Sequence, residues 1–314
     1  MAEWLYEAGI GERRAALVAD GRIVEAAIER DDASLRVGTV APARRTAPDR
    51  VTFADGTEAQ LAVPAPGVSE GAALAVRIVR EAIPEPGRAK LARAVPSDDP
   101  TAPGPDLLAR LAASDHPVRH LLAHQPDALE AAGWSELLDE AATGEIVFPR
   151  GALRMTPTPA MTLFDVDGAA PLPPLALAAA TEVARAIRRH GIGGSIGIDF
   201  PTLAGKAERR AVAEAIDAAM TWRGASAFER TAMNGFGFLQ IVRPRPRASL
   251  PELLRADPVA AAARAALRRL EREPPGPPRA HRLPPRVLAH LLGHPTWLGE
   301  LARRTGGAPR LESE

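Results

Sequence analysis

The stretch 161–168, MTLFDVDG, ends an apolar run with two aspartates, Asp165 and Asp167. In a β-strand, residues i and i+2 point to the same face, so both carboxylates would lie together near the carboxyl end of the strand. Like charges this close repel each other unless a cation or a proton compensates them. The stretch therefore predicts a strand whose acidic end needs a compensating charge.

A second predicted strand, GSIGIDF (194–200), also ends in an acid, Asp199. Open sheets place their ligands at the carboxyl ends of strands. Mg²⁺ is commonly held there by one or two carboxylates, completed by water and by substrate phosphate oxygens. One interpretation is therefore a divalent-cation site. The other is that these aspartates cap turns at the strand ends, and the spacing alone leaves both open.

Composition and charge narrow the class of protein. The chain has 314 residues, a formal net charge of zero and no cysteine, which excludes a disulfide scaffold, a thiolate zinc site and a cysteine nucleophile. A neutral balance provides no overall basic field for nucleic acid. The sequence lacks a secretory signal and an apolar run of membrane-spanning length, so we expect a cytoplasmic protein without membrane contact. Many arginines against two lysines suggest a GC-rich bacterial genome.

The first hundred residues indicate β-structure. Alternating runs flank Asp20-Gly21 and Asp55-Gly56, which are hairpin turn signals. About five short strands between residues 35 and 95 predict a small β-barrel of the OB kind. The segment 96–105, PSDDPTAPGP, has the composition of a linker.

The rest of the chain mixes helices and strands. The leucine spacing over 106–142 predicts helix, and further helices are predicted within 173–191, 205–222 and 258–272. A hairpin is expected near Asn234-Gly235. The fold class predicted from these patterns is α+β.

Five motifs in order carry a family resemblance: PTPAMTLFDVDG (157–168), AAATEVARAIRRHGIGG (178–194), IGIDF (196–200), ERRAVAEAI (208–216) and GFGFLQIVRPR (235–245). Their succession resembles the catalytic core of the ribonuclease E/G family, best over 145–247 and 8–30. The likeness implies a mixed sheet with helices, an OB-like barrel inserted near the N-terminus and a helical C-terminal tail. The implied segments are an N-terminal hairpin segment of the core (1–34), the OB-like barrel (35–95), a linker and helical segment (96–144), the metal-binding catalytic core (145–247) and an Arg/Pro-rich helical tail (248–314).

The resemblance also implies an activity. In the family, two aspartates hold a catalytic Mg²⁺, and the matching positions are Asp165 and Asp199. This implies a Mg²⁺-dependent endoribonuclease that cleaves single-stranded RNA to 5′-phosphate and 3′-hydroxyl products. Asp167 is the third predicted catalytic residue, at a position where large members carry an asparagine that orients the first aspartate. Its extra charge could tighten the metal, bring a second ion or repel the RNA backbone.

Several departures from the family keep a rival interpretation open. Without cysteine, the zinc link between subunits cannot form, so any homodimer would lack it. No Arg-Thr pair matches the family's 5′-end sensor, the RNA-contacting loop is cut to GAAPLPP (168–174), and Gly235 occupies an arginine position. These losses favour a catalytically weak or inactive RNA-binding or assembly protein with the same fold, whereas both aspartates favour the enzyme. A weaker third alternative is a metal-dependent hydrolase of another phosphate ester.

RNA contacts are expected from cations around the core and tail, with a solvated arginine-rich surface as the alternative. In the barrel, Phe53 is the only aromatic residue available for stacking. The predicted RNA-binding residues are Arg243, Arg245, Arg247, Lys206, Arg209 and Phe53, with Arg264, Arg268 and Arg269 added from the tail.

Overall fold

The structure, a computed structural model, describes residues 2–31, 35–85, 87, 89–222, 224–273 and 280–314. It forms two compact units. The first unit combines Met1–Ser34, Asp106–Trp134 and Leu253–Glu314, and the second combines Leu35–Pro105 and Ser135–Glu252. The first and last of the predicted segments thus contribute to the same unit. No helix in the described ranges has the length and apolar character that a membrane span requires.

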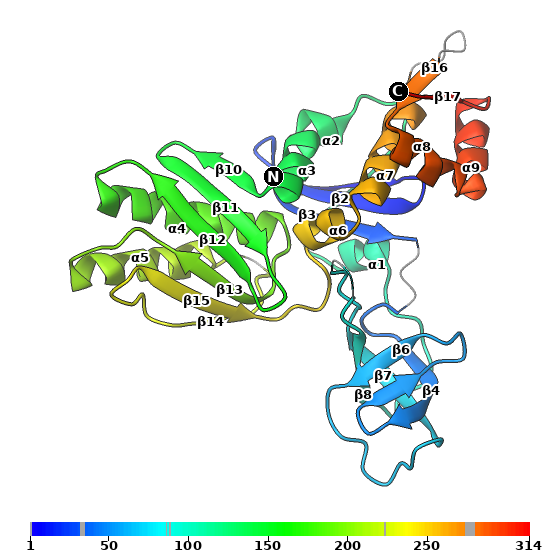
Figure 1. The fold of residues 1–314 in the computed structure, drawn as a ribbon, viewed down its shortest axis with the longest axis horizontal. Helices are drawn as coiled ribbons and strands as arrows, with labels where there is room; N and C mark the ends of the chain where they lie inside the picture. Colours follow the sequence, from blue (N-terminus) through cyan, green and yellow to red (C-terminus); the bar gives the residue numbers. More distant parts are fainter. Residues whose placement is uncertain (1, 32–34, 86, 88, 223, 274–279) are drawn as a thin grey trace. The chain divides into compact units, whose positions relative to one another are not determined.

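Five strands of the second unit close into a barrel in the order β4-β5-β6-β8-β7 (Figure 1). They are β4 (Val40–Ala47), β5 (Arg50–Thr52), β6 (Glu58–Leu61), β7 (Ala73–Arg80) and β8 (Ala92–Pro96). The predicted turn at Asp55-Gly56 joins β5 to β6, and Gly56 has the positive φ of 84° that such a turn requires. Val51, Val76 and Ile78 fill the interior. A small barrel of five short strands therefore agrees with the prediction for residues 35–95.

The second unit also contains a six-stranded sheet in the order β10-β11-β12-β13-β15-β14. Its elements are α3 (Trp134–Thr143), β10 (Glu145–Phe148), β11 (Gly151–Pro157), β12 (Thr162–Gly168), α4 (Leu172–Arg189), β13 (Gly194–Asp199), α5 (Lys206–Ala219), β14 (Glu229–Arg230) and β15 (Phe238–Arg243). Only β12 and β13 pair in parallel, joined by α4, whereas the other neighbours are antiparallel. This crossover brings the carboxyl ends of β12 and β13 to the same edge of the sheet.

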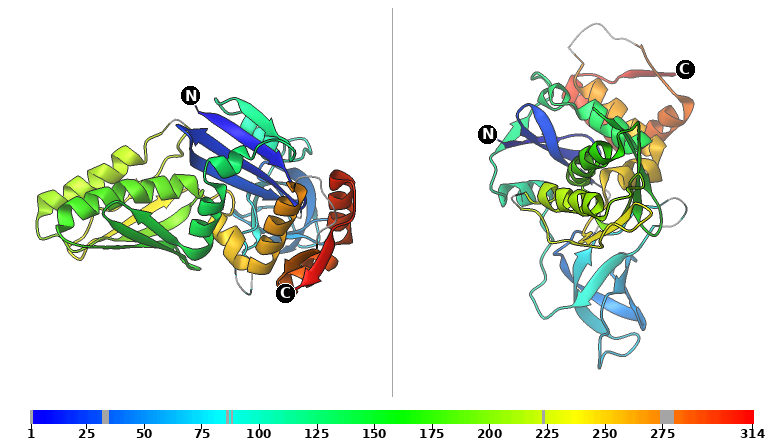
Figure 2. Two further views of the ribbon diagram at one scale, coloured as in Figure 1. Left: turned by 90° about the horizontal axis from the view of Figure 1, so that it is seen from above. Right: turned by 90° about the vertical axis from the view of Figure 1, so that its left-hand side faces the viewer.

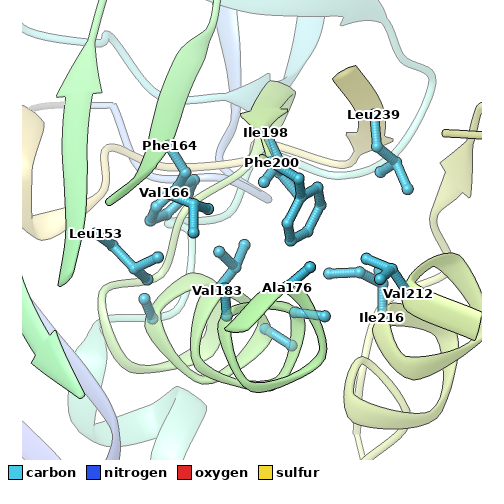
Figure 3. Close-up of a cluster of buried hydrophobic side chains, with 14 of the residues drawn as sticks. Leu153, Phe164, Val166, Ala176, Val183, Ile198, Phe200, Val212, Ile216 and Leu239 are labelled. Atoms are coloured by element: carbon cyan, nitrogen blue, oxygen red, sulfur yellow. The ribbon is translucent and has the colours of Figure 1, made fainter. Parts of the chain in front are cut away.

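Helices α4 and α5 lie side by side on one face of this sheet (Figure 2). Apolar side chains from alternate strand positions pack against them, among them Phe164, Ile198 and Leu239 (Figure 3). The facing helix residues include Val183 and Ile216. Since successive strand residues point to opposite faces, burying this set directs the intervening residues of β11, β12 and β13 to the other face.

The first unit contains a four-stranded sheet in the order β3-β2-β1-β9. Its strands are β1 (Glu3–Ala8), β2 (Glu12–Ala19), β3 (Arg22–Arg30) and β9 (Val118–Leu121), and its helices are α1 (Leu107–Ala112), α2 (Ala128–Ala131), α6 (Leu250–Ala256, from Leu253 on), α7 (Pro258–Glu271), α8 (Pro285–Leu292) and α9 (Pro295–Thr305), with β16 (Ala280–Leu283) paired to β17 (Arg310–Ser313). The predicted β2–β3 hairpin is confirmed, with positive φ at Asp20 and Gly21.

The helical prediction for 106–142 is wrong at residues 118–121. These residues form β9, which pairs in parallel with β1. Proline disfavours helical backbone in the residue before it, and Pro117 stands directly before this strand. Its carbonyl oxygen accepts a hydrogen bond of 2.8 Å from the Trp4 N–H, so β-pairing replaces the helix that leucine spacing suggested.

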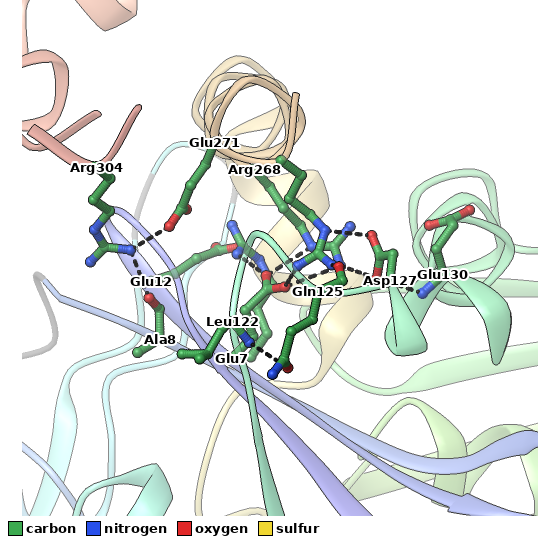
Figure 4. A network of polar contacts seen from close by, with 12 residues as sticks. Glu7, Ala8, Glu12, Leu122, Gln125, Asp127, Glu130, Arg268, Glu271 and Arg304 are labelled. Atoms are coloured by element: carbon green, nitrogen blue, oxygen red, sulfur yellow. Dashed lines mark hydrogen bonds and ion pairs between the residues drawn. The ribbon is translucent and has the colours of Figure 1, made fainter. Parts of the chain in front are cut away.

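Buried ion pairs join α7 to the N-terminal strands of the first unit (Figure 4). The buried Glu7 carboxylate accepts hydrogen bonds from Arg14 at 2.8 Å, Arg268 at 2.8 Å and Arg272 at 2.9 Å. Arg268 also donates to Asp127 at 2.7 Å. These arginines are structural partners of Glu7, which is buried, and of Asp127, which is half-buried. The structure thereby corrects the expectation that Arg268 is a free phosphate-binding group.

Arg264, also predicted as a tail contact to RNA, has the same kind of structural role. Its side chain is buried on α7 and lies over the Trp297 ring, with 5.0 Å between the guanidinium carbon and the ring centroid. Arg269, on the same helix, is exposed. Of these three tail arginines, Arg269 alone retains the exposure that a phosphate contact needs.

Candidate active site

Four charged side chains stand opposite one another across four neighbouring strands of the second unit. The strand register aligns Glu145 of β10 with Arg154 of β11, Arg154 with Asp165 of β12, and Asp165 with Asp199 of β13. All four are exposed. We call this set the charged row. Asp167 lies on the same strand face as Asp165, two residues further along β12, so the three aspartates singled out in the sequence share one face of the sheet.

The two aspartates proposed as metal ligands differ from Asp167 in their contacts. Neither Asp165 nor Asp199 accepts a hydrogen bond or forms an ion pair with any described residue, whereas the Asp167 carboxylate lies 3.5 Å from Nε of Arg154. Neighbouring carboxylates without protein partners are the hard oxygen donors that Mg²⁺ prefers. The residues present therefore fit such an ion.

The donor set at this position is small. Among the residues that the structure describes, no group of three or more histidine, cysteine, aspartate or glutamate side chains is placed to hold a metal ion. A cation between Asp165 and Asp199 would complete its coordination with water and phosphate oxygens, which is the usual mode for Mg²⁺.

An exposed aromatic residue lies on the turn beside Asp199. Phe238 is opposite Asp199 in the β13–β15 register, and the preceding turn carries Phe236, which is 85% exposed. The Asn234 Oδ1 atom holds this turn by accepting hydrogen bonds from the N–H groups of Phe236 and Phe238, at 2.9 and 3.1 Å. Phe236 is thus presented to solvent from a fixed position near the charged row.

Glycine is required at position 237 of the same turn. Its φ is +98°, and a Cβ there would lie 2.2 Å from the carbonyl oxygen of Phe200, the residue that follows Asp199. The absence of a side chain lets the turn approach the end of β13 closely. This packing ties the position of Phe236 to that of Asp199.

Sequence reasoning singled out neither Arg154 nor Phe236 as a site residue. The sequence signal for Arg154 was a single charged residue between two apolar residues of a predicted strand, Leu153 and Met155. The signal for Phe236 was a large aromatic residue between two glycines, a composition more typical of an exposed turn than of a core.

Most of the predicted RNA-binding cations of the second unit already contact protein groups. Arg243 donates to the Ile192 carbonyl at 3.1 Å and to Ser226 Oγ at 2.8 Å. Arg209 donates to two backbone carbonyls, those of Leu203 and Ala204. The roles of Arg243 and Arg209 in RNA binding remain predictions. An RNA phosphate would have to replace these protein contacts in order to bind either side chain.

The remaining cations are of two kinds. Arg245 forms an ion pair with Glu252, and Arg247 pairs with Glu81 at 3.0 Å. Lys206, the first residue of α5, is exposed and has no hydrogen bond or ion pair to a described residue. Of the predicted cations of the second unit, Lys206 is therefore the one whose charge is most available to a phosphate.

Phe53 is not placed to stack on a base. Its side chain is 9% exposed and packs in the barrel interior with Val51 and Leu61. Stacking needs an open aromatic face, so the structure corrects this expectation for Phe53.

Two exposed carboxylates thus lie in register on the parallel strands β12 and β13, Asp165 within β12 and Asp199 at the end of β13, with Arg154 of β11 opposite Asp165. Residues 106–246 match the sequence model of the ribonuclease E/G family. The match confirms the resemblance noted in the motifs, supports a member of the ribonuclease E/G family and indicates a ribonuclease function. A comparison with curated proteins found no match.

Proposed function

We propose that the protein is a Mg²⁺-dependent endoribonuclease that hydrolyses single-stranded RNA to products with 5′-phosphate and 3′-hydroxyl ends. The observation that carries the proposal is the register of β12 and β13, which sets Asp165 beside Asp199 without a protein partner in the described residues. The family match over 106–246 supports RNA as the substrate. In this proposal the six-stranded sheet is the family's catalytic core, and the barrel is its OB-type insertion.

The chain's own groups have distinct tasks in this reaction. Asp165 and Asp199 would hold Mg²⁺, which when bound lowers the pKa of a coordinated water and offsets charge on the phosphate. The exposed edge admits a phosphodiester without displacing any described partner of the two carboxylates. Phe236 offers an aromatic face beside Asp199, and such faces bind the unpaired bases of single strands.

The test compares Asp165→Asn and Asp199→Asn with Asp139→Asn, an exposed aspartate of α3 outside the charged row. Each site variant should lower cleavage of a labelled single-stranded RNA by roughly two to three orders of magnitude, the range for loss of one preorganised electrostatic group. Each should also lose binding of Mn²⁺, measured by calorimetry without RNA. The control should behave like the wild type, and EDTA should abolish cleavage.

The rival function has an observation in its favour. β12 ends at Gly168 and α4 begins at Leu172, so the segment that could carry an RNA-contacting loop is very short. A protein that binds RNA but fails to cleave it with Mg²⁺, Mn²⁺ or Ca²⁺ would be the binding or assembly protein. Equal cleavage by wild type and both site variants would instead remove Asp165 and Asp199 from the mechanism.

A further inference from the structure

Arg154 is the basic member of the charged row. It stands in register between Glu145 and Asp165, and its side chain is 61% exposed. Directly opposite residues on one sheet face have Cβ atoms about 4.5–5.5 Å apart. The Arg154 side chain therefore starts next to that of Asp165, one of the two aspartates proposed to hold the metal.

Arg154 forms ion pairs with Glu145 and Asp167. Nε lies 3.5 Å from Glu145 Oε1 and 3.5 Å from Asp167 Oδ2. The two terminal nitrogens donate no hydrogen bond to any described residue. Exposed pairs at such distances contribute about 0–1 kcal/mol to stability, so these acids orient the side chain more than they stabilise the fold. The terminal N–H groups therefore keep their hydrogen-bonding capacity with respect to the described residues.

We propose that Arg154 binds a phosphate of the RNA at the cleavage site through its terminal nitrogens, and that Asp167 is the positioning residue that holds this guanidinium beside Asp165 and Asp199. The inference rests on the proposed function. A guanidinium fork matches two phosphate oxygens and supplies positive charge where negative charge develops during cleavage. It also gives Asp167 a task, because Arg154 neutralises a carboxylate that would otherwise repel the RNA backbone.

The experiment uses the full chain with five changes: Arg154→Gln, Arg154→Lys, Asp167→Asn, the double variant Arg154→Gln/Asp167→Asn, and the control Arg185→Gln. Arg185 on α4 is a matched control because it is 68% exposed and pairs with Glu182 at the same distance of 3.5 Å. The measurements are cleavage of single-stranded RNA, RNA affinity in EDTA against salt concentration, and Mn²⁺ affinity without RNA.

We expect Arg154→Gln to slow cleavage 10²- to 10³-fold, as for loss of one preorganised donor. The salt slope of RNA binding should fall by about 0.7, the value for one phosphate contact to a single strand. Arg154→Lys should recover part of the rate, since lysine keeps the charge but loses the fork. Asp167→Asn should slow cleavage while Mn²⁺ affinity changes less than about threefold. The double variant should be no slower than Arg154→Gln, because positioning has no effect once the positioned group is gone.

The proposal would be overturned if Arg154→Gln cleaved RNA at the wild-type rate and bound RNA with the wild-type salt dependence. The positioning role of Asp167 would be overturned if the double variant lost as much cleavage rate as the product of the losses in Arg154→Gln and Asp167→Asn. Failure of the proposed function looks different, since Asp165→Asn would then retain cleavage and Mn²⁺ binding. If the wild type never cleaves, the difference in salt slope between Arg154→Gln and Arg185→Gln still decides whether Arg154 contacts phosphate.

Discussion

At the scale of single residues, the exposure of Phe236 points to binding, since a phenyl ring in water adds nothing to a core. Phe236→Ala should weaken single-stranded RNA binding by roughly 1–3 kcal/mol, the range for loss of one stacked base, and leave thermal stability unchanged. Filter binding in EDTA measures this without cleavage. Val147→Ala is the control, because Val147 is 83% exposed on the edge strand β10. Equal RNA affinity of Phe236→Ala and wild type would exclude stacking on this ring.

The same scale shows how far sequence reasoning reaches into the site. The shared face of Asp165 and Asp199 was readable because apolar alternation marks which side chains of a strand point the same way. Asp199 ends β13 as predicted, whereas β12 continues beyond Asp165 to Gly168. The partner of Asp167 was not readable. Alternation assigns Arg154 to a face, but its neighbours depend on the pairing of β10, β11 and β12, and tertiary packing sets that register.

At the scale of an element, α7 depends on Glu7 of β1. Glu7→Gln leaves Arg14, Arg268 and Arg272 without their shared buried carboxylate. Breaking one partner of a buried ion pair costs about 3–5 kcal/mol, and urea unfolding should show a loss of this size. Glu3→Gln on the same strand is the control, since the Glu3–Arg119 pair is exposed and such pairs contribute about 0–1 kcal/mol. Similar losses in both variants would contradict the buried network's role.

The elements themselves were predictable where local chemistry decides. The β2–β3 hairpin follows from Asp20-Gly21, and the helix predicted over 258–272 is α7. The structural role of the α7 arginines was not predictable from the sequence. A row of arginines on a helix has the same pattern whether the arginines bind RNA or pair with acids of the same protein. Only the position of Glu7 and Asp127, distant in sequence from α7, distinguishes the two.

At the scale of the whole molecule, each unit contains an acid whose pKa is lowered. Burial raises the pKa of Asp127, but hydrogen bonds from Arg268 and the Glu130 N–H, with the charges of Arg268 and Arg272, outweigh it and bring it below its usual 3.8. Burial likewise raises the pKa of Glu140, but the hydrogen bonds and charges of His190 and Arg189 outweigh this effect, so the net pKa lies below the usual 4.5.

Because these folded-state pKa values lie below the unfolded ones, the unfolded chain binds protons first as pH falls. The stabilisation is complete above about pH 4.5 and is lost as pH falls through the lowered values. Thermal midpoints measured by circular dichroism from pH 7 to pH 2.5 should decline below pH 4.5. Asp127→Asn should be less stable at pH 7 and lose less on acidification. A wild-type midpoint that is constant from pH 5 to pH 3 would contradict this coupling.

The interleaving of the two units has a consequence during translation. Strands β1 to β3 leave the ribosome before α7, which follows more than two hundred residues later, an interval of roughly ten to fifty seconds at ordinary elongation rates. Most of the second unit emerges in between. During that interval Glu7 can pair with Arg14 but not with Arg268 or Arg272, so the first unit completes its buried ion-pair network only after α7 has been synthesised.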